Sequence, residues 1–295
     1  MVYSTHLILY LPGIFISFQL DSNVIIIMAY KGLWAFFKFS WTRKLFFKAL
    51  YEVLPRVNGK GDWQFMNYGY SPTKKEESTN KKPLENKLQQ HPLNMYHYLA
   101  CCASIKELHL LEVGSGRGGG ANYIANNFQP KSIIGLDFSA SAIKLAKSMF
   151  DSPNLSYVEG NAMNLDFESN HFDVIINVES CHAYANQSKF LSEVLRVLKP
   201  GGKLLLVDFR KNHLWPNFEK AMNALSFRVE KEDISGNVLK ALKEESSLKK
   251  SEIDKKMPKF LRKYFYEFAG LEGTELFQQI ESGTSKYKRF ICTKE

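Results

Sequence analysis

A run of glycines directly after an apolar segment constrains the fold of this chain more than any other feature. Residues 108–113 are short and apolar, and they lead into Gly114-Ser115-Gly116-Arg117-Gly118-Gly119, which has the spacing G-x-G-x-x-G. A buried strand, a glycine-rich turn and then a helix are the opening unit of a doubly wound α/β domain. Glycines let the main chain approach a ligand without a Cβ clash. The motif therefore predicts a nucleotide-type cofactor site, without choosing the cofactor.

Apolar runs and helical patterns alternate along the chain that follows. We expect further strands at residues 132–137, 155–159, 172–178, 203–209 and 287–292, and helices at residues 119–128, 140–150 and 187–198. This alternation predicts a Rossmann-like α/β fold, with a doubly wound, mostly parallel sheet and helices on both faces. Residues 216–281 break the rhythm, and their charged pattern predicts a helical insertion before the last strand.

The domain organisation divides into three predicted ranges. Residues 1–28 are expected to be an upstream extension outside the fold, because Met28 can serve as a second start. Residues 29–92 are expected to form an N-terminal aromatic helical segment, which covers the site as a lid, followed by a linker. Residues 93–295 are expected to be the main domain, with its helical insertion at about 216–281. The apolar run 7–20 is broken by a proline and a glycine, and it is too short to span a membrane.

Composition restricts the class of partner. The net charge is +9, but no nucleic-acid module is recognisable, so nucleic acid is not an expected partner. The basic residues cluster at 31–48 and 240–263 among aromatic side chains, which suits peripheral contact with an anionic membrane; a solvated face is the competing interpretation. The four cysteines form no CxxC pair, so we expect a cytoplasmic protein without a metal site.

Polar side chains flank the glycine run at positions that suit a cofactor. Glu112 stands two residues before Gly114, where a carboxylate can steer a cationic amino-acid group. Asp137 ends the second expected strand and can accept both hydroxyls of a ribose. A helix N-cap is the competing interpretation of Asp137. We expect Gly114 and Gly116 to lie against the cofactor.

Three further residues complete the expected cofactor site. Asn161 and Ala162 follow the third expected strand, where a side-chain amide can meet an adenine ring. Asn177, near the end of the fourth strand, is a further expected contact. Asp137 serves NAD and S-adenosylmethionine alike, whereas Glu112 and Asn161 favour S-adenosylmethionine.

Residues 108–210 resemble the class I S-adenosylmethionine-dependent methyltransferases. Residues 112–118 are similar to the first motif of that family, and 172–175 and 195–202 to its later motifs. The resemblance implies a Rossmann-like domain that binds S-adenosyl-L-methionine. One departure is Asn161, where many members carry an aspartate.

A closer resemblance covers roughly residues 45–295. The phrases at 118–123, 135–137, 177–184 and 271–274 are similar to the phthiotriolone/phenolphthiotriolone dimycocerosate methyltransferases. That family O-methylates a hydroxyl on a long lipid. The resemblance implies a small apolar hydroxylated acceptor, either a lipid or a polyketide-like molecule.

Transfer to an alcohol needs a base that takes the hydroxyl proton. His182 follows the fourth expected strand, at the edge where ligands sit in such sheets, and an ordinary histidine pKa of ~6.5 suits this task. A structural histidine is the competing interpretation. Glu179 is the second candidate base.

Several functions stay open on the sequence alone. O-methyl transfer is favoured, and C- or N-methyl transfer to a sterol, quinone or phosphoethanolamine-type substrate is the alternative. A non-catalytic, membrane-associated cofactor-binding protein and an NAD-dependent dehydrogenase are further interpretations. The sequence predicts no oligomeric state.

Overall fold

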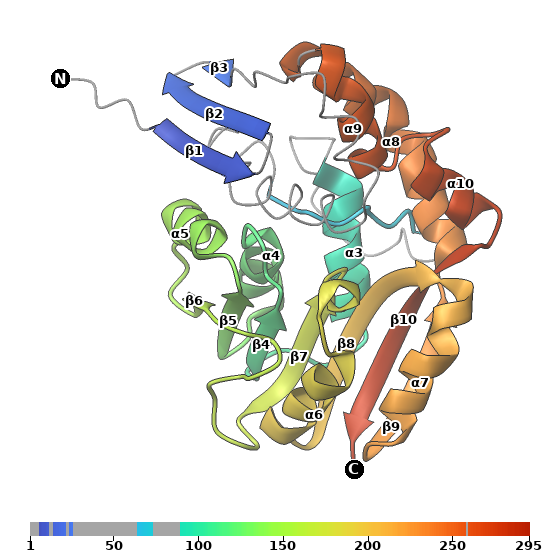
Figure 1. Ribbon diagram of the computed structural model, residues 1–295. Coiled ribbons are helices and arrows are strands. Elements are labelled where there is room, and N and C mark those ends of the chain that lie inside the picture. The colour runs from blue at the N-terminus through green and yellow to red at the C-terminus, as the bar shows by residue number, and fades with distance from the viewer. Residues whose placement is uncertain (1–5, 12–13, 22–23, 26–63, 73–88, 258) are drawn as a thin grey trace. The chain divides into compact units, whose positions relative to one another are not determined.

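The computed structural model describes residues 6–11, 14–21, 24–25, 64–72, 89–257 and 259–295 (Figure 1). The chain divides into two units, Met1–Val57 and Asn58–Glu295. In the first unit, β1 (His6–Leu11), β2 (Ile14–Asp21) and β3 (Val24–Ile25) form a small antiparallel sheet. The aromatic helical segment expected in the first part of residues 29–92, and most of the linker expected after it, lie outside the described residues. The upstream extension therefore stays a prediction.

The second unit is built on a seven-stranded sheet in the order β6-β5-β4-β7-β8-β10-β9 (Figure 1). Its strands are β4 (His109–Val113), β5 (Ser132–Asp137), β6 (Leu155–Glu159), β7 (Phe172–Val178), β8 (Leu198–Lys211), β9 (Phe227–Asp233) and β10 (Ser285–Lys294). The first five strands of this order are parallel, whereas β10 runs antiparallel to both β8 and β9. The predicted mostly parallel, Rossmann-like sheet is confirmed.

Helices cover both faces of this sheet. They are α3 (Gln90–Ala100), α4 (Gly119–Phe128), α5 (Ala140–Met149), α6 (Gln187–Val197), α7 (Trp215–Asn223), α8 (Ser235–Lys256), α9 (Lys259–Ala269) and α10 (Glu275–Glu281), with the short turns η2 (Cys181–Ala183) and η3 (Asn212–Leu214). One buried apolar cluster lies against each face of the sheet. Alternate β8 residues divide between them: Leu205 packs with the α3, α4 and α8 side, and Leu206 with the α6 and α7 side. Because successive side chains of a strand point to opposite faces, this one strand contributes to the cores on both sides of the sheet.

The insertion at 216–281 departs from the expectation of helix alone. Residues 227–233 form strand β9, which pairs antiparallel with β10 at the edge of the sheet. Phe227 is buried, and most of the charged side chains that follow are exposed. An edge strand rich in charged residues shows little alternation of apolar and polar side chains, so its sequence does not indicate a strand. It pairs with a strand about 60 residues later in the chain, and that pairing is a tertiary interaction. The rest of the insertion is helical, as expected.

The strand order places the topological switch point of the sheet between β4 and β7. β4 pairs with β5 on one side and with β7 on the other, so the chain leaves β4 and β7 toward opposite faces. Ligands of such sheets bind outside the carboxyl ends of the strands at this point. The glycine run follows β4 and the turn η2 follows β7, so both expected halves of the site converge there.

Candidate active site

The glycine loop after β4 is held in a conformation that favours glycine. Gly114, Gly116 and Gly118 have φ angles of 78°, 52° and 85°. A Cβ on Gly114 would lie 2.4 Å from Oγ of Ser180, so the main chain approaches the β7 side closely there. The nearest atom to a Cβ on Gly116 would be Cγ of Met66 at 3.7 Å, an ordinary van der Waals distance, so a side chain there would not clash. The loop therefore offers main-chain groups that a ligand can reach.

Asp137 at the end of β5 closes this loop. Oδ2 of Asp137 accepts a hydrogen bond from the Gly116 amide at 2.8 Å, and Oδ1 accepts one from the Ser139 amide at 2.9 Å. Ser139 itself caps α5, since its Oγ accepts from the Ala142 amide. Asp137 thus shapes the loop and the start of α5 together. A carboxylate oxygen has two lone pairs and can accept more than one hydrogen bond.

Glu112 is completely buried behind the loop. Its Oε1 accepts a hydrogen bond from the Tyr96 hydroxyl at 2.7 Å, and its Oε2 has no hydrogen-bond partner among the described residues. Burial raises the pKa of Glu112 to about 8, although the Tyr96 hydrogen bond and the nearby Ala121 amide work against this shift. A buried carboxyl group with an unpartnered oxygen suits a cationic ligand group, since such a group would supply the missing partner.

The remaining cofactor candidates lie in different environments. Asn161 is exposed after β6, and its Oδ1 accepts from the Met163 amide at 2.9 Å. Ala162 is buried beside it. Asn177 is fully buried, and its Nδ2 donates to the Val113 carbonyl at 2.8 Å and to Oγ of Ser180 at 2.7 Å. The Asn177 amide nitrogen therefore ties β7 to the end of β4, while Oδ1 lacks a partner among the described residues.

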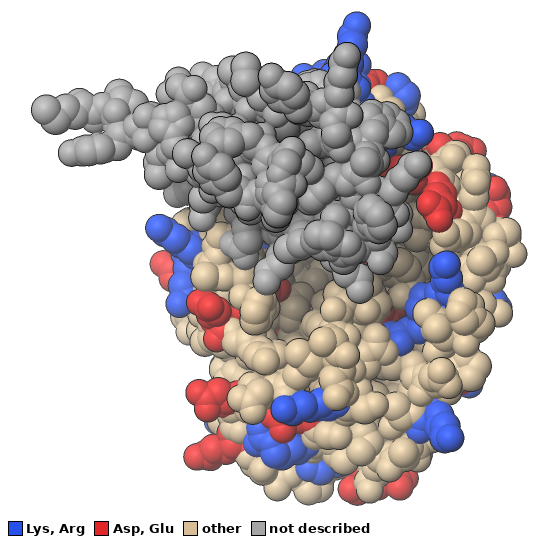
Figure 2. All heavy atoms as spheres, viewed as in Figure 1, with Lys and Arg blue, Asp and Glu red and all other residues tan. Residues whose placement is uncertain are grey.

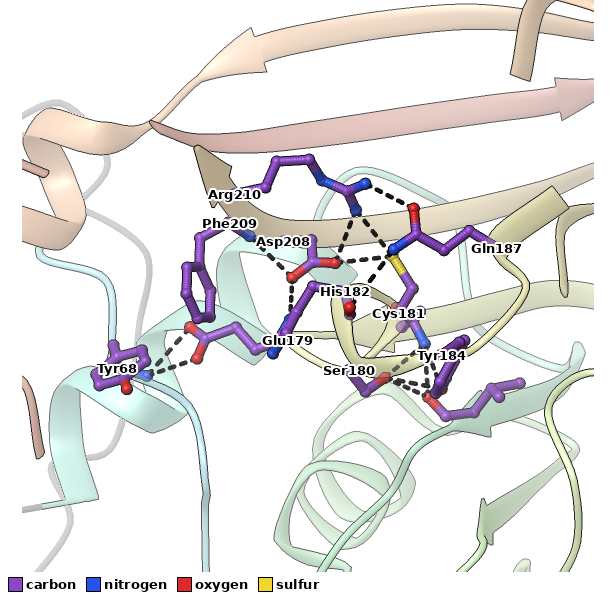
Figure 3. Close-up of polar contacts among 12 residues, drawn as sticks. Tyr68, Glu179, Ser180, Cys181, His182, Tyr184, Gln187, Asp208, Phe209 and Arg210 are labelled. Atoms are coloured by element: carbon purple, nitrogen blue, oxygen red, sulfur yellow. Dashed lines mark hydrogen bonds and ion pairs between the residues drawn. The ribbon is translucent and has the colours of Figure 1, made fainter. Parts of the chain in front are cut away.

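His182 in η2 is oriented by a carboxylate from the next strand (Figure 3). Its Nδ1 lies 2.6 Å from Oδ1 of Asp208, which is completely buried, whereas 33% of the His182 side chain is exposed. Burial opposes the His182 cation, but the Asp208 charge and hydrogen bond outweigh it and raise the pKa of His182. No described residue bonds Nε2, so that nitrogen is left to accept a proton.

Asp208 is in turn fixed through its second oxygen. Oδ2 accepts from Sγ of Cys181 at 2.7 Å and pairs with Arg210 at 3.1 Å. Arg210 lies over the Phe218 ring at 3.8 Å and donates to Oε1 of Gln187 at 2.8 Å. Despite the burial, the neighbouring His182 and Arg210 charges hold the pKa of Asp208 below its usual range. The carboxylate therefore stays ionised.

Sequence reasoning missed Asp208 and Arg210. Their signal was present, because the apolar strand Leu204-Leu205-Leu206-Val207 ends in a charged residue at the carboxyl edge. Which histidine that charge meets depends on the pairing of β7 with β8, and the sequence does not display that pairing.

Glu179, the second candidate base, follows β7 directly. Its carboxylate oxygens both lie 3.1 Å from the amide nitrogen of Tyr68 (Figure 3). Burial raises the pKa of Glu179 to about 8. The group is therefore already engaged with the main chain of a distant segment.

Metal-binding side chains do not gather within the described part of the chain, where no group of three or more His, Cys, Asp or Glu residues is placed to hold an ion. The four cysteines, all within this part, form no disulfide.

Known proteins resemble this chain in sequence. Residues 111–206 match a family model described as a methyltransferase domain. The phthiotriol/phenolphthiotriol dimycocerosates methyltransferase of Mycobacterium tuberculosis is 34% identical over 257 residues, which cover 86% of this chain and 94% of that protein. The fatty-acid O-methyltransferase of Mycolicibacterium smegmatis is 30% identical over 250 residues, which cover 84% of this chain and 89% of that protein.

Solved structures share the fold at low identity. The geranyl diphosphate C-methyltransferase of Streptomyces coelicolor A3(2) superposes with a TM-score of 0.61 at 14% identity, over 84% of this chain and 96% of that one. At this identity the likeness concerns the fold alone.

Proposed function

The chain belongs to the phthiotriol/phenolphthiotriol dimycocerosates methyltransferase family of S-adenosylmethionine-dependent enzymes, and we propose that its acceptor is a hydroxyl of an apolar lipid or polyketide-like molecule. The cofactor is S-adenosyl-L-methionine, so a dehydrogenase function does not apply. The relatives named above act on lipids, which supports an apolar acceptor. The observation that carries a hydroxyl in particular is the oriented His182–Asp208 pair.

We assign the cofactor contacts to residues around the switch point. Main-chain groups at Gly114 and Gly116 would face the cofactor, and Asp137 would accept its ribose hydroxyls. Glu112 would pair with its cationic amino group, because Oε2 has no hydrogen-bond partner among the described residues and such a group would supply one.

Three residues would complete the cofactor contacts. Asn161 and Ala162 follow β6 and would meet the adenine, and Oδ1 of Asn177 would accept a further bond. When bound, the cofactor supplies a methyl group already activated on a sulfonium, so the protein has mainly to align and desolvate the reactants.

His182 acts as the base in this scheme. Asp208 holds Nδ1, which fixes the tautomer and leaves the Nε2 lone pair for the acceptor proton. During methyl transfer the proton of the acceptor hydroxyl would pass to Nε2 of His182, and the Asp208 carboxylate would stabilise the resulting imidazolium. Asp208 is a positioning residue, since it acts through His182.

This base distinguishes a hydroxyl from a carboxylate acceptor. The carboxylate of a fatty acid has no proton to lose at neutral pH. The buried Asp208 carboxylate set behind His182 would then have no proton transfer to assist. We therefore expect hydroxylated lipids to be better acceptors than fatty acids.

The test is product identification. Purified protein is incubated with methyl-labelled cofactor and cell lipid extract, or with octadecan-1-ol or octadecanoate as matched probes. A labelled methyl ether supports the proposal. A labelled C-methyl or N-methyl product, or faster labelling of octadecanoate, contradicts it.

We also infer a peripheral contact with an anionic membrane. No described helix is long and apolar enough to cross a bilayer. Basic side chains gather near the top of the view in Figure 2, over α8 and α9. The exposed lysines at the C-terminal end of α8 and in α9 are Lys250, Lys255, Lys256, Lys259 and Lys263. Such a cluster is attracted to anionic lipid within a Debye length.

Vesicle co-sedimentation tests this contact. We expect binding to phosphatidylcholine vesicles that contain phosphatidylglycerol, weaker binding at high salt, and a loss after Lys255→Glu with Lys256→Glu. Recovery in the supernatant with anionic vesicles at low salt would contradict the inference.

A further inference from the structure

We propose that Glu179 is a positioning residue that holds residues 64–72, here called the strap, across the carboxyl edge of the sheet. In this role it sets Tyr68 against Phe209, so that the two rings form an aromatic wall for the apolar part of the acceptor beside His182. The inference rests on the proposed function, because it concerns the acceptor of that reaction.

The strap begins over the glycine loop. The amides of Gln64 and Phe65 both donate to Oε1 of Gln89 at 2.8 Å. A Cβ on Gly119 would lie 2.5 Å from the Gln64 carbonyl oxygen, so the strap presses directly on the start of α4. The first residues of the strap therefore touch the proposed cofactor side.

The far end of the strap is fixed to α8. The Ser71 amide donates to the Asn237 carbonyl at 3.2 Å, and Nδ2 of Asn237 donates back to the Ser71 carbonyl at 3.0 Å. Oγ of Ser71 also donates to Glu244 at 3.0 Å. With both ends secured, the middle of the strap spans the distance from the cofactor side to the acceptor side.

Glu179 holds that middle part. Its two carboxylate oxygens share the Tyr68 amide at 3.1 Å each (Figure 3). Glu179 has a φ of 48°, a left-handed conformation that is costly for a residue with a Cβ, while its own amide donates to the Val207 carbonyl at 2.8 Å. Unusual backbone of this kind is retained where the surrounding structure requires it. Here it turns the carboxyl group toward the strap.

The consequence is an aromatic wall next to the candidate base. The Tyr68 ring meets the Phe209 ring edge-on at 5.7 Å, and Phe209 lies 4.6 Å from the His182 ring, measured between centroids. Tyr287 stacks on Phe209 at 5.1 Å from within the sheet. Tyr68 and Phe209 are only half-buried, so apolar surface remains beside His182.

Glutamine at position 179 would distinguish the positioning role from the role of a base. A glutamine at 179 still offers a carbonyl oxygen to the Tyr68 amide, but it cannot take a proton. The proposal therefore separates Glu179→Gln from Glu179→Ala, which loses the contact. Glu230→Ala, at an exposed glutamate of β9, is the matched control.

The experiment measures acceptor KM and kcat, cofactor affinity and amide exchange for the three variants. We expect Glu179→Ala to raise acceptor KM about tenfold, the loss of ~1.4 kcal/mol of contact, with kcat within about threefold and cofactor affinity unchanged. Glu179→Gln and Glu230→Ala should keep near-normal KM. Equal loss of kcat in the glutamine and alanine variants would make Glu179 the base and overturn the proposal.

Amide hydrogen exchange tests the role of Glu179 independently of which acceptor the enzyme methylates. In Glu179→Ala the Tyr68 amide should exchange at least tenfold faster, since it loses its acceptor, while the amides of Gln64 and Phe65 should keep their protection. This readout needs no methyl transfer, so a failed acceptor assay would count against the proposed function alone. Unchanged protection of the Tyr68 amide would overturn the inference. Thermal unfolding of each variant checks that the fold persists.

Discussion

Nδ1 of His182, which follows β7, lies 2.6 Å from Oδ1 of Asp208, which lies in the neighbouring parallel strand β8. Their pairing converts an ordinary histidine into an oriented acceptor of protons. Because Arg210 and Cys181 engage the other oxygen of Asp208, the carboxylate is held ionised in a buried position. The first three predictions follow from this pair.

Replacing His182 with alanine removes the proposed base. We expect turnover to fall ~10²–10⁴-fold with cofactor affinity retained. His213→Ala, at an exposed histidine of η3, is the control and should retain turnover. The measurement is a methyl-transfer rate together with a titration of S-adenosylhomocysteine. Normal turnover in the His182 variant would reject the role as base.

Asp208→Asn keeps the volume of the side chain and removes its charge. Because Arg210 then lacks its buried counter-charge, we expect the free energy of unfolding to fall by about 3 kcal/mol. Turnover should also fall, since the imidazolium loses its stabilising carboxylate. Chemical denaturation measures the first effect, with Asp151→Asn at an exposed position as control. An unchanged stability would show that the Asp208–Arg210 pair contributes no net stability.

The pH profile of kcat should report His182. Asp208 raises the pKa of His182, so the neutral base forms only above the ordinary value of 6.5, and activity should rise with pH through a midpoint above it. The stability from this pair has the opposite trend: it is fully present below 6.5 and is lost as pH rises through the raised value. In Asp208→Asn the midpoint should move to lower pH. A midpoint that does not move would separate the profile from His182.

Glu112 should couple cofactor binding to proton release. Its pKa of about 8 in the protein leaves the carboxyl group largely protonated at pH 7, and a cationic ligand group would restore the carboxylate. We expect binding of S-adenosylhomocysteine at pH 7 to release part of a proton, measured by calorimetry in buffers of different ionisation enthalpy. Glu112→Gln should abolish the release and weaken binding. Equal release by that variant would exclude Glu112 as its source.

Gly114 and Gly116 of the glycine loop should differ in how well they tolerate replacement by alanine. In Gly114→Ala the new Cβ meets Oγ of Ser180 at 2.4 Å in a left-handed conformation, so we expect a loss of at least about 2 kcal/mol in stability. Gly116→Ala makes no clash and should lose about 1–2 kcal/mol from the backbone conformation alone, with weaker cofactor binding. Gly201→Ala, equally left-handed but remote, should leave binding unchanged. Equal binding by the variants at 116 and 201 would remove Gly116 from the cofactor site.

Local sequence patterns predicted most of the strands and helices of the fold. The helix Gly119–Phe128 and the strands Ser132–Asp137, Leu155–Glu159 and Phe172–Val178 have the predicted bounds, and the family, the enzyme class and the cofactor are confirmed. Strand β9 was missed, because an edge strand rich in charge shows little apolar alternation. The individual site residues stay predictions for the experiments above.

The sequence by itself determined the alternating α/β architecture, the glycine loop and the candidates Glu112, Asp137 and His182, because periodicity and turn chemistry act over a few residues. Only the tertiary structure decided what each candidate meets. Asp208 reaches His182 through the register of β7 against β8, and Glu179 reaches Tyr68 over a separation of 111 residues. Such contacts depend on how distant segments pack, and no local pattern records that packing.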